Sequence, residues 1–367
     1  MDLTLTEEQR LLADSARRFL SREVGTEVVR DLEAEPEGFR RDLWKRMTAL
    51  GWTSVAFTEA DGGMDGGFGD LLVIAEELGR AAVSAPLYVS VALGALPLAW
   101  SSAIRARERY LAGLVDGSLI ATTALLEPDG RAWWPTSGGA GGRLNGRKLF
   151  VPFAASADLL LVTTTLDGEH ALVAVPTDRA GIEVRRLDAI GTEPQFEVSL
   201  DVVLSPDDVI ARGSAADDVV ARALDAAAVL TAGHVVGLTE GALALGVAHA
   251  KDREQFGKPI GTFQAVANRL VDVRSEVDAL RLLVHRAAWA LDTGSPDAGL
   301  HIAEAKAYAN WTARTTVANT HQSMGAIGFT MEHDLQLYTR RLKAFEVAFG
   351  RPAVHLERVA DRLGLVG

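Results

Sequence analysis

Two short stretches of this sequence combine residue types that can hold a flat, anionic ligand. The first, REQFGKPIGTFQAV at residues 253–266, places Arg253, Gln255 and Phe256 beside a Gly-Lys-Pro turn. A guanidinium can bind a pyrophosphate through two parallel hydrogen bonds, and a phenyl ring can flank an aromatic ligand. The same residues also suit an ordinary helix end, where the helix dipole favours a cation and the ring joins the core.

The second stretch is QSMGAIGFT at residues 322–330. The side chain of Gln322 can donate a hydrogen bond to a phosphate oxygen, and the glycines at 325 and 328 allow close approach of the backbone to a ligand. Glycine serves a simple helix-breaking turn equally well. Because both stretches occur in one chain, we favour a shared binding site over two unrelated turns.

Helices are predicted on both sides of a β domain. Residues 1–115 show helical spacing of apolar residues and begin with a capping box from Thr6 to Gln9. Alternating apolar runs predict strands in 118–205, with hairpin turns at Asn145-Gly146 and Asp167-Gly168. Helical spacing returns at Asp217 and continues nearly to the end. We therefore predict an α+β, mostly helical protein with three domains, at residues 1–115, 118–205 and 215–367.

The most apolar long stretch is AAAVLTAGHVVGLTEGALALGVAHA at residues 226–250. His234 and Glu240 interrupt it, and it is rich in Ala and Gly, so we expect a helix buried in a bundle and not a membrane span. Glycine recurs at every fourth position, at residues 233, 237 and 241. Three helix-weakening glycines on one flank indicate that a neighbouring helix approaches closely.

Composition excludes several classes of function. The chain has 367 residues, no cysteine and a net charge of -12, which rules out thiol chemistry and argues against binding to nucleic acid. The acidic start, with Asp2, Glu7 and Glu8, does not match a secretory signal, so we expect a cytoplasmic protein. The eight histidines show no spacing typical of a zinc site, and we predict no metal.

The order of helices, strands and a long helical bundle, together with REQFGKPIGTFQA and QSMGAIGFTMEHDLQLYTRRLKA, resembles the acyl-CoA dehydrogenase family across essentially the whole chain. The segments ALLEPDG and LNGRKLFVPFAASADLLLV resemble its middle domain. The resemblance implies an N-terminal helical domain, a middle β-barrel-like domain and a C-terminal four-helix bundle. It also implies FAD, an acyl-CoA substrate, an acceptor such as electron-transfer flavoprotein, and a flavin shared between two subunits.

By this resemblance the following residues would bind the FAD of a neighbouring subunit: Arg253, Gln255, Phe256, Gln322, Gly325 and Ala326. Family members more often have glycine where Ala326 stands, so backbone contact with the cofactor would be looser there. A Thr or Ser that usually donates a hydrogen bond near flavin N5 is replaced by Pro152, which has no donor. Trp133 and Trp134 stand in place of a serine-containing loop, and we expect them to cover the β domain.

The resemblance also identifies two positions for the catalytic base, and neither holds a carboxylate. These positions are Phe349, six residues after Lys343, and Ala227, on the long helix before Arg253. Glu346 is the fallback candidate. It comes three residues early, which displaces it by about 4.5 Å along a helix.

The leading hypothesis is therefore that this chain is a subunit with no catalytic residue of its own. It would pair with a homologous acyl-CoA dehydrogenase chain that supplies the base. Family precedent for such mixed tetramers includes bulky steroid-side-chain substrates. One alternative is a self-sufficient homo-oligomer that uses Glu346, Glu240 or Asp225. A second is a non-enzymatic helical scaffold or acyl-CoA binder, and the least favoured is a flavin oxygenase.

Overall fold

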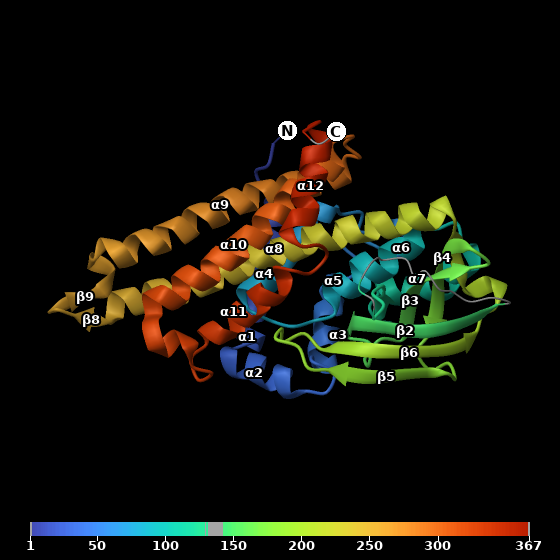
Figure 1. Ribbon diagram of the computed structural model, residues 1–367, viewed down its shortest axis with the longest axis horizontal. Coiled ribbons are helices and arrows are strands. Elements are labelled where there is room, and N and C mark those ends of the chain that lie inside the picture. The colour runs from blue at the N-terminus through green and yellow to red at the C-terminus, as the bar shows by residue number, and fades with distance from the viewer. Residues whose placement is uncertain (1, 129, 131–141, 366–367) are drawn as a thin grey trace.

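The N-terminal part of the computed structural model is helical (Figure 1), and the structure describes residues 2–128, 130 and 142–365. Thr6 and Gln9 form the predicted capping box, in which each side chain accepts a hydrogen bond from the other residue's backbone amide. The α-helices here are α1 (Glu7–Glu23), α2 (Thr26–Ala34), α3 (Arg41–Ala49), α4 (Phe68–Arg80), α5 (Leu87–Ser90), α6 (Leu96–Trp100) and α7 (Ile104–Val115). A π-helix, η2 (Val91–Ala95), joins α5 to α6.

Two sheets form the middle of the chain. One has the strand order β1-β3-β4-β7 and the other β2-β6-β5, with a parallel pair only between β1 and β3 among these strands. Their inner faces share one apolar core, because side chains alternate along each strand. The strands are β1 (Ala121–Ala124), β2 (Arg143–Pro152), β3 (Leu159–Leu166), β4 (Glu169–Pro176), β5 (Ile182–Leu187), β6 (Gln195–Val203) and β7 (Val209–Arg212).

One of the two predicted turns is confirmed and the other is wrong. Asp167 and Gly168 join β3 to β4 with φ of 51° and 87°, as a tight hairpin requires. Asn145 and Gly146 instead lie inside β2, opposite Asp201 and Leu200 of β6. Pairing with a strand more than fifty residues away outweighs the local turn preference at this position. Trp133 and Trp134 lie outside the described residues.

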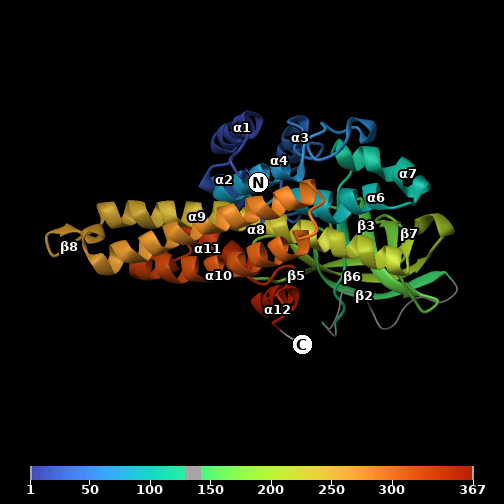
Figure 2. The same cartoon turned by 90° about the horizontal axis from the view of Figure 1, so that it is seen from above.

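The C-terminal part is a bundle of long helices, and this architecture confirms the predicted fold class. Figures 1 and 2 show α8, α9 and α10 side by side along the longest axis, with the β8–β9 hairpin at one end. Its elements are α8 (Ser214–Asp252), β8 (Glu254–Gln255), β9 (Lys258–Pro259), α9 (Gln264–Asp292), α10 (Ala298–Met324), the 3₁₀ helix η5 (Gly325–Phe329), α11 (Leu335–Phe345) and α12 (Pro352–Arg362).

Helix α8 is long and apolar enough to cross a membrane, but most of its apolar stretch is buried inside the fold. Its glycines explain part of this burial. A Cβ at Gly237 would stand 1.9 Å from the carbonyl oxygen of Glu76, and one at Gly79 of α4 would stand 2.2 Å from that of His234. The two helices are therefore in backbone contact, and the predicted close approach along the glycine flank is confirmed.

Candidate cofactor and substrate site

The two motifs lie at the same end of the bundle (Figure 1). Arg253 caps the C-terminus of α8, and the hairpin with Gln255 and Phe256 follows it. Gln322 lies in the last turn of α10, directly before η5. Because α9 starts at this end and α10 returns to it, the hairpin and η5 lie at the same end of the bundle although some seventy residues separate them in the chain.

The hairpin presents its aromatic and cationic groups to the outside. Phe256 is 93% exposed and has a φ of 53°, a strained conformation for a phenylalanine. A phenylalanine left in water forgoes about 2 kcal/mol of burial, so such exposure indicates a surface that a ligand or another chain covers. Among the described residues, no acid forms an ion pair with Arg253, whose guanidinium can therefore meet a phosphate.

The η5 turn has the backbone geometry that the motif suggested. Gly325 has φ 67° and ψ −145°, which favours glycine strongly, and Phe329 at the other end of η5 is 72% exposed. The ring of His321 stacks on Phe329 at 4.4 Å and orients it. Ala326 lies exposed within the turn. The bundle end thus fits a pyrophosphate and a flat ring, the two chemical parts that one half of an FAD site must hold.

The chain's own flavin cradle fits less well. Strand β2 carries a bulge between Lys148 and Val151, where Phe150 has a φ of 53° and is 54% exposed. Bulges of this kind redirect a side chain. Pro152 follows, and its carbonyl accepts a 2.6 Å hydrogen bond from Thr122. Since proline lacks an amide hydrogen, nothing at this position can donate to flavin N5.

Ala227, the first of the two expected base positions, is completely buried in apolar surroundings. The residues one and two turns before it on the same face of α8, Val220, Ala223 and Leu224, line a cavity of about 10 Å³. Such a space holds about one water molecule.

Phe349, the second expected base position, lies in the turn after α11 with a φ of 54°. Its ring meets the ring of Tyr88 edge to face, with centroids 6.3 Å apart. Its carbonyl oxygen is 2.9 Å from Nε2 of His355, and the carbonyl of Gly350 accepts a 3.1 Å hydrogen bond from Asn310. The polar side chains of His355 and Asn310 therefore hold this turn in place. The side chain of Phe349 itself cannot accept a proton.

Sequence reasoning missed one carboxylate near this turn. Glu193, on the loop between β5 and β6, accepts a 2.6 Å hydrogen bond from the hydroxyl of Tyr88. Burial raises the pKa of Glu193 to about 7, although the Tyr88 hydrogen bond and the guanidinium of Arg341 act against it. Nothing in the local sequence distinguishes this glutamate from one on a solvated loop, because its burial depends on α5 and α11.

Two of the alternative bases are engaged in ion pairs. Glu346 lies 2.5 Å from the ammonium of Lys343. Asp225 lies 3.0 Å from the guanidinium of Arg358, while burial raises its pKa. Each carboxylate is therefore already paired with a cation of this chain.

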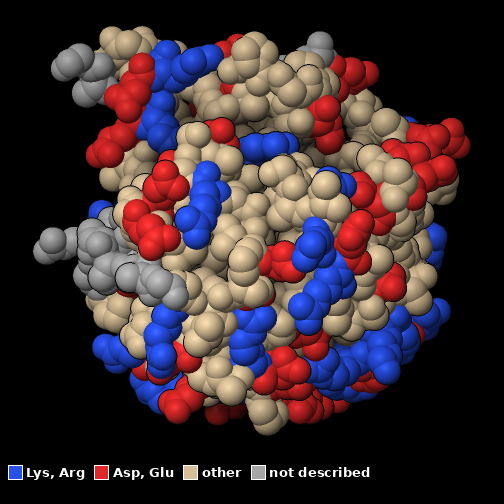
Figure 3. Space-filling model, turned by 90° about the vertical axis from the view of Figure 1, so that its right-hand side faces the viewer, with Lys and Arg blue, Asp and Glu red and all other residues tan. Residues whose placement is uncertain are grey.

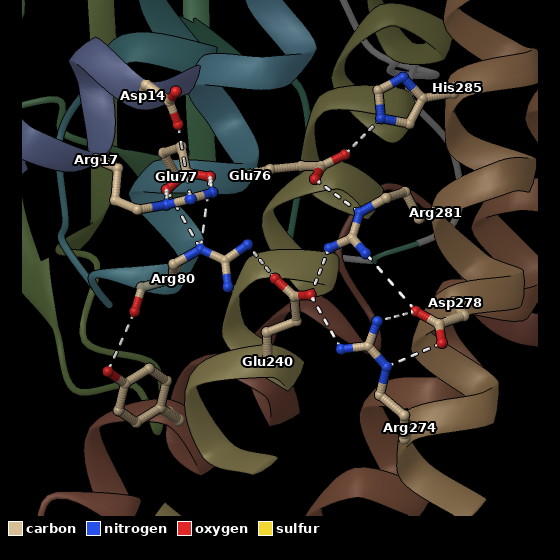
Figure 4. Close-up of polar contacts among 11 residues, drawn as sticks. Asp14, Arg17, Glu76, Glu77, Arg80, Glu240, Arg274, Asp278, Arg281 and His285 are labelled. Atoms are coloured by element: carbon tan, nitrogen blue, oxygen red, sulfur yellow. Dashed lines mark hydrogen bonds and ion pairs between the residues drawn. The ribbon is translucent and has the colours of Figure 1, made fainter. Parts of the chain in front are cut away.

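Glu240, the third alternative base, belongs to a network of charges between the N-terminal helices and the bundle (Figure 4). Its carboxylate is shared by Arg80 of α4 and by Arg274 and Arg281 of α9, the last at 2.7 Å. Arg281 also contacts Glu76 of α4. We conclude that Glu240 joins three helices.

Within the described residues, no group of three His, Asp or Glu side chains is arranged to hold a metal. Figure 3 shows the end of the molecule formed by the β domain, where Lys and Arg lie among Asp and Glu and no field of one sign dominates. This face offers no broad basic surface for nucleic acid.

Comparison with known proteins gives matches over the whole chain. Residues 6–118 match the family "Acyl-CoA dehydrogenase, N-terminal domain", and residues 218–364 match "Acyl-CoA dehydrogenase, C-terminal domain". A relative named acyl-CoA dehydrogenase FadE28, from Mycobacterium tuberculosis, is 28% identical and covers 100% of both chains.

Two solved structures share the fold closely. One is the ChsE4-ChsE5 complex from Mycobacterium tuberculosis, with a TM-score of 0.91, 26% identity and 100% of both chains covered. The other is a variant of the "Tcur3481-Tcur3483 steroid ACAD", with a TM-score of 0.89, 30% identity and 99% of both chains covered.

Proposed function

Because this chain belongs to the acyl-CoA dehydrogenase family of FAD-dependent enzymes, we propose that it is the base-lacking subunit of a hetero-oligomer. The complex would carry out α,β-dehydrogenation of an acyl-CoA thioester. A homologous acyl-CoA dehydrogenase subunit would supply the base and the flavin cradle, and electrons would pass to an acceptor such as electron-transfer flavoprotein.

The observation that carries this proposal is the contrast between the two halves of the site. At the bundle end, Arg253 and Phe256 are open to a ligand or a neighbouring chain. At the base positions, Phe349 and Ala227 offer no oxygen; Ala227 is completely buried, and Phe349 is half-buried against the ring of Tyr88. The bundle end has groups that can bind a cofactor, whereas the expected base positions have no group that can take a proton from a substrate. This contrast favours a division of labour between two chains.

In this proposal the bundle end of the chain reaches the cofactor bound in its partner. Bound FAD supplies the two-electron acceptor that the reaction requires. Arg253 would bind its pyrophosphate, Gln255 and Gln322 would donate hydrogen bonds to its polar oxygens, and Phe256 would flank a ring. Gly325 and Ala326 would let the backbone of η5 approach it. The similarity to the ChsE4-ChsE5 complex and to the steroid enzyme Tcur3481-Tcur3483 supports a hetero-oligomer and a bulky acyl group.

The test is to purify the chain alone and together with homologous candidate partners, and to measure FAD absorbance and acyl-CoA oxidation. We expect little bound FAD and no turnover for the chain alone. In one of the complexes we expect both bound FAD and acyl-CoA oxidation. In that complex Arg253→Ala should lower FAD affinity by about tenfold or more. Arg269→Ala, which removes an exposed arginine at the same end of the bundle, is the matched control.

Full FAD occupancy with rapid acyl-CoA oxidation by the solitary chain would contradict the subunit role. Equal loss of FAD from the Arg253 and Arg269 variants would contradict the assignment of Arg253 to the pyrophosphate.

A further inference from the structure

Aromatic rings from separate elements meet around the position expected for the base. Tyr88 of α5 contacts Phe345 at the end of α11 and Phe349 in the following turn, both edge to face, with centroids 6.1 and 6.3 Å apart. The ring of His234 on α8 lies 5.2 Å from Phe345. We call Tyr88, Phe345 and Phe349 the aromatic plug.

The position of Tyr88 matters because a base at residue 349 would need space for the substrate beside it. A catalytic carboxylate must come within about 3 Å of the atom whose proton it takes. Substrate atoms would therefore have to lie directly beside side chain 349. The ring of Tyr88, which is buried, takes up space next to that side chain.

Tyr88 is held in this place by its hydroxyl. A buried tyrosine hydroxyl needs a hydrogen-bond partner, and Glu193 accepts from it at 2.6 Å. The loop that carries Glu193 is fixed in turn, because the carbonyl of Pro194 accepts a 3.0 Å hydrogen bond from the amide of Phe153. Gly191 of the same loop has no room for a side chain, since a Cβ there would lie 2.7 Å from that of Ala344 on α11.

Ala227, the other expected base position, is completely buried. A cavity of about 10 Å³ lies beside the turns of α8 that precede it, and is lined by side chains of α8, of η2, of α6 and of strands β1, β3 and β4. It is large enough for about one water molecule and not for an acyl chain.

We propose that the aromatic plug, locked by the Tyr88–Glu193 hydrogen bond, fills the acyl pocket of this chain's own half-site. This inference rests on the proposed function, since it explains why this half is inactive. It goes further in stating that the pocket is not merely without a base but closed to the acyl group. A substrate bound to the complex then places its acyl chain in the partner subunit.

The experiment compares binding of CoA and of octanoyl-CoA to the purified chain by isothermal titration calorimetry. The wild-type chain should bind octanoyl-CoA no more tightly than CoA, because the acyl group finds no pocket. The double variant Tyr88→Ala/Phe349→Ala should gain at least a tenfold preference for octanoyl-CoA. Glu193→Leu, which removes the acceptor for Tyr88, should shift the preference in the same direction by a smaller factor.

Phe19→Ala is the matched control, because it removes a ring that packs edge to face on Trp52 in another part of the core. It should leave the preference unchanged. A wild-type chain that already prefers octanoyl-CoA tenfold would overturn the plug, whether or not the double variant folds. A folded double variant that gains no preference for octanoyl-CoA would also overturn the plug. If the double variant does not fold, Phe349→Ala is measured in its place.

The outcomes separate this inference from the proposed function. A solitary wild-type chain that binds octanoyl-CoA selectively but does not oxidise it would refute the plug and leave the subunit role standing. A solitary chain that holds FAD and oxidises acyl-CoA would refute the subunit role itself.

Discussion

Single residues at this site act through neighbours that come from distant parts of the chain. Glu193 illustrates the effect, because it is a carboxylate whose pKa depends on burial against α5 and α11. Burial lowers the pKa of His234, whose ring lies against that of Phe345, to about 3. Near neutral pH His234 is therefore uncharged, and Glu193 keeps its proton in a large share of molecules, because burial disfavours the charged form of both groups.

Glu193 should give the folded protein a measurable pH dependence. Its pKa is about 7 in the folded state against 4.5 ordinarily, so between these values the folded chain keeps a proton that the unfolded chain releases. The free energy of unfolding should therefore fall as pH rises from 4.5 through 7. Relative to Glu193→Gln, we expect a decline on the order of 2 kcal/mol.

Urea denaturation of both proteins at several pH values measures this difference. The titration of His234 is common to both proteins and cancels in the comparison. Parallel pH profiles for the wild type and Glu193→Gln would show that the pKa of Glu193 is not raised in the folded protein.

Glu346 should be dispensable for chemistry. Its carboxylate faces Lys343, and we expect Glu346→Gln to change the turnover of the assembled complex by less than about twofold, because a base-free subunit loses no proton acceptor. Steady-state rates with bound FAD quantified in the same sample provide the measurement. A drop of a hundredfold with FAD retained would identify Glu346 as the base and remove the division of labour between subunits.

At the level of secondary structure elements, the contact between α4 and α8 determines how the N-terminal helices dock on the bundle. It depends on positions without side chains, since Gly237 faces the backbone of Glu76 and Arg80, and Gly79 faces the backbone of α8. A backbone neighbour cannot rotate away as the end of a side chain can, so any added atom must push the helices apart.

Gly237→Ala should therefore destabilise the protein by about 3 kcal/mol, despite the better helix propensity of alanine. Gly246→Ala on the same helix is the matched control, because its nearest neighbour is the end of the Leu270 side chain at 3.1 Å. We expect that variant to lie within about 1 kcal/mol of the wild type. Thermal or urea unfolding measures the stability of both variants. Equal stabilities of Gly237→Ala and Gly246→Ala would contradict backbone contact at Gly237.

Across the whole molecule, the N-terminal helices and the bundle are joined by charges as well as by glycines. Glu240 on α8 is the centre of this network, because guanidinium groups of both α4 and α9 converge on it (Figure 4). Removing one partner from a buried network leaves the other charges uncompensated, which costs more than the pair itself contributes.

Glu240→Gln should lower the free energy of unfolding by about 3 kcal/mol and should loosen the N-terminal helices first. Differential scanning calorimetry gives the stability, and limited proteolysis identifies the segment that opens. Glu357→Gln, an exposed glutamate of α12, is the control and should have no effect beyond about 0.5 kcal/mol. If both variants melt alike, the network does not stabilise the docking of these helices.

The sequence by itself determined the features that depend on neighbouring residues along the chain. The capping box at Thr6, the hairpin at Asp167-Gly168 and the long helix with its glycine flank all follow from local spacing. The family resemblance and the absence of a carboxylate at Phe349 and Ala227 could also be read without coordinates, because they are matters of residue identity at aligned positions.

Only the tertiary structure decided what these residues meet. Asn145-Gly146 continues a strand because β6 pairs with it, and Glu240 holds helices together because three arginines converge on it. Glu193 contacts Tyr88 across 105 positions of sequence. Burial, hydrogen-bond partners and pKa values arise from contacts between distant segments, and no local pattern specifies which segments will meet.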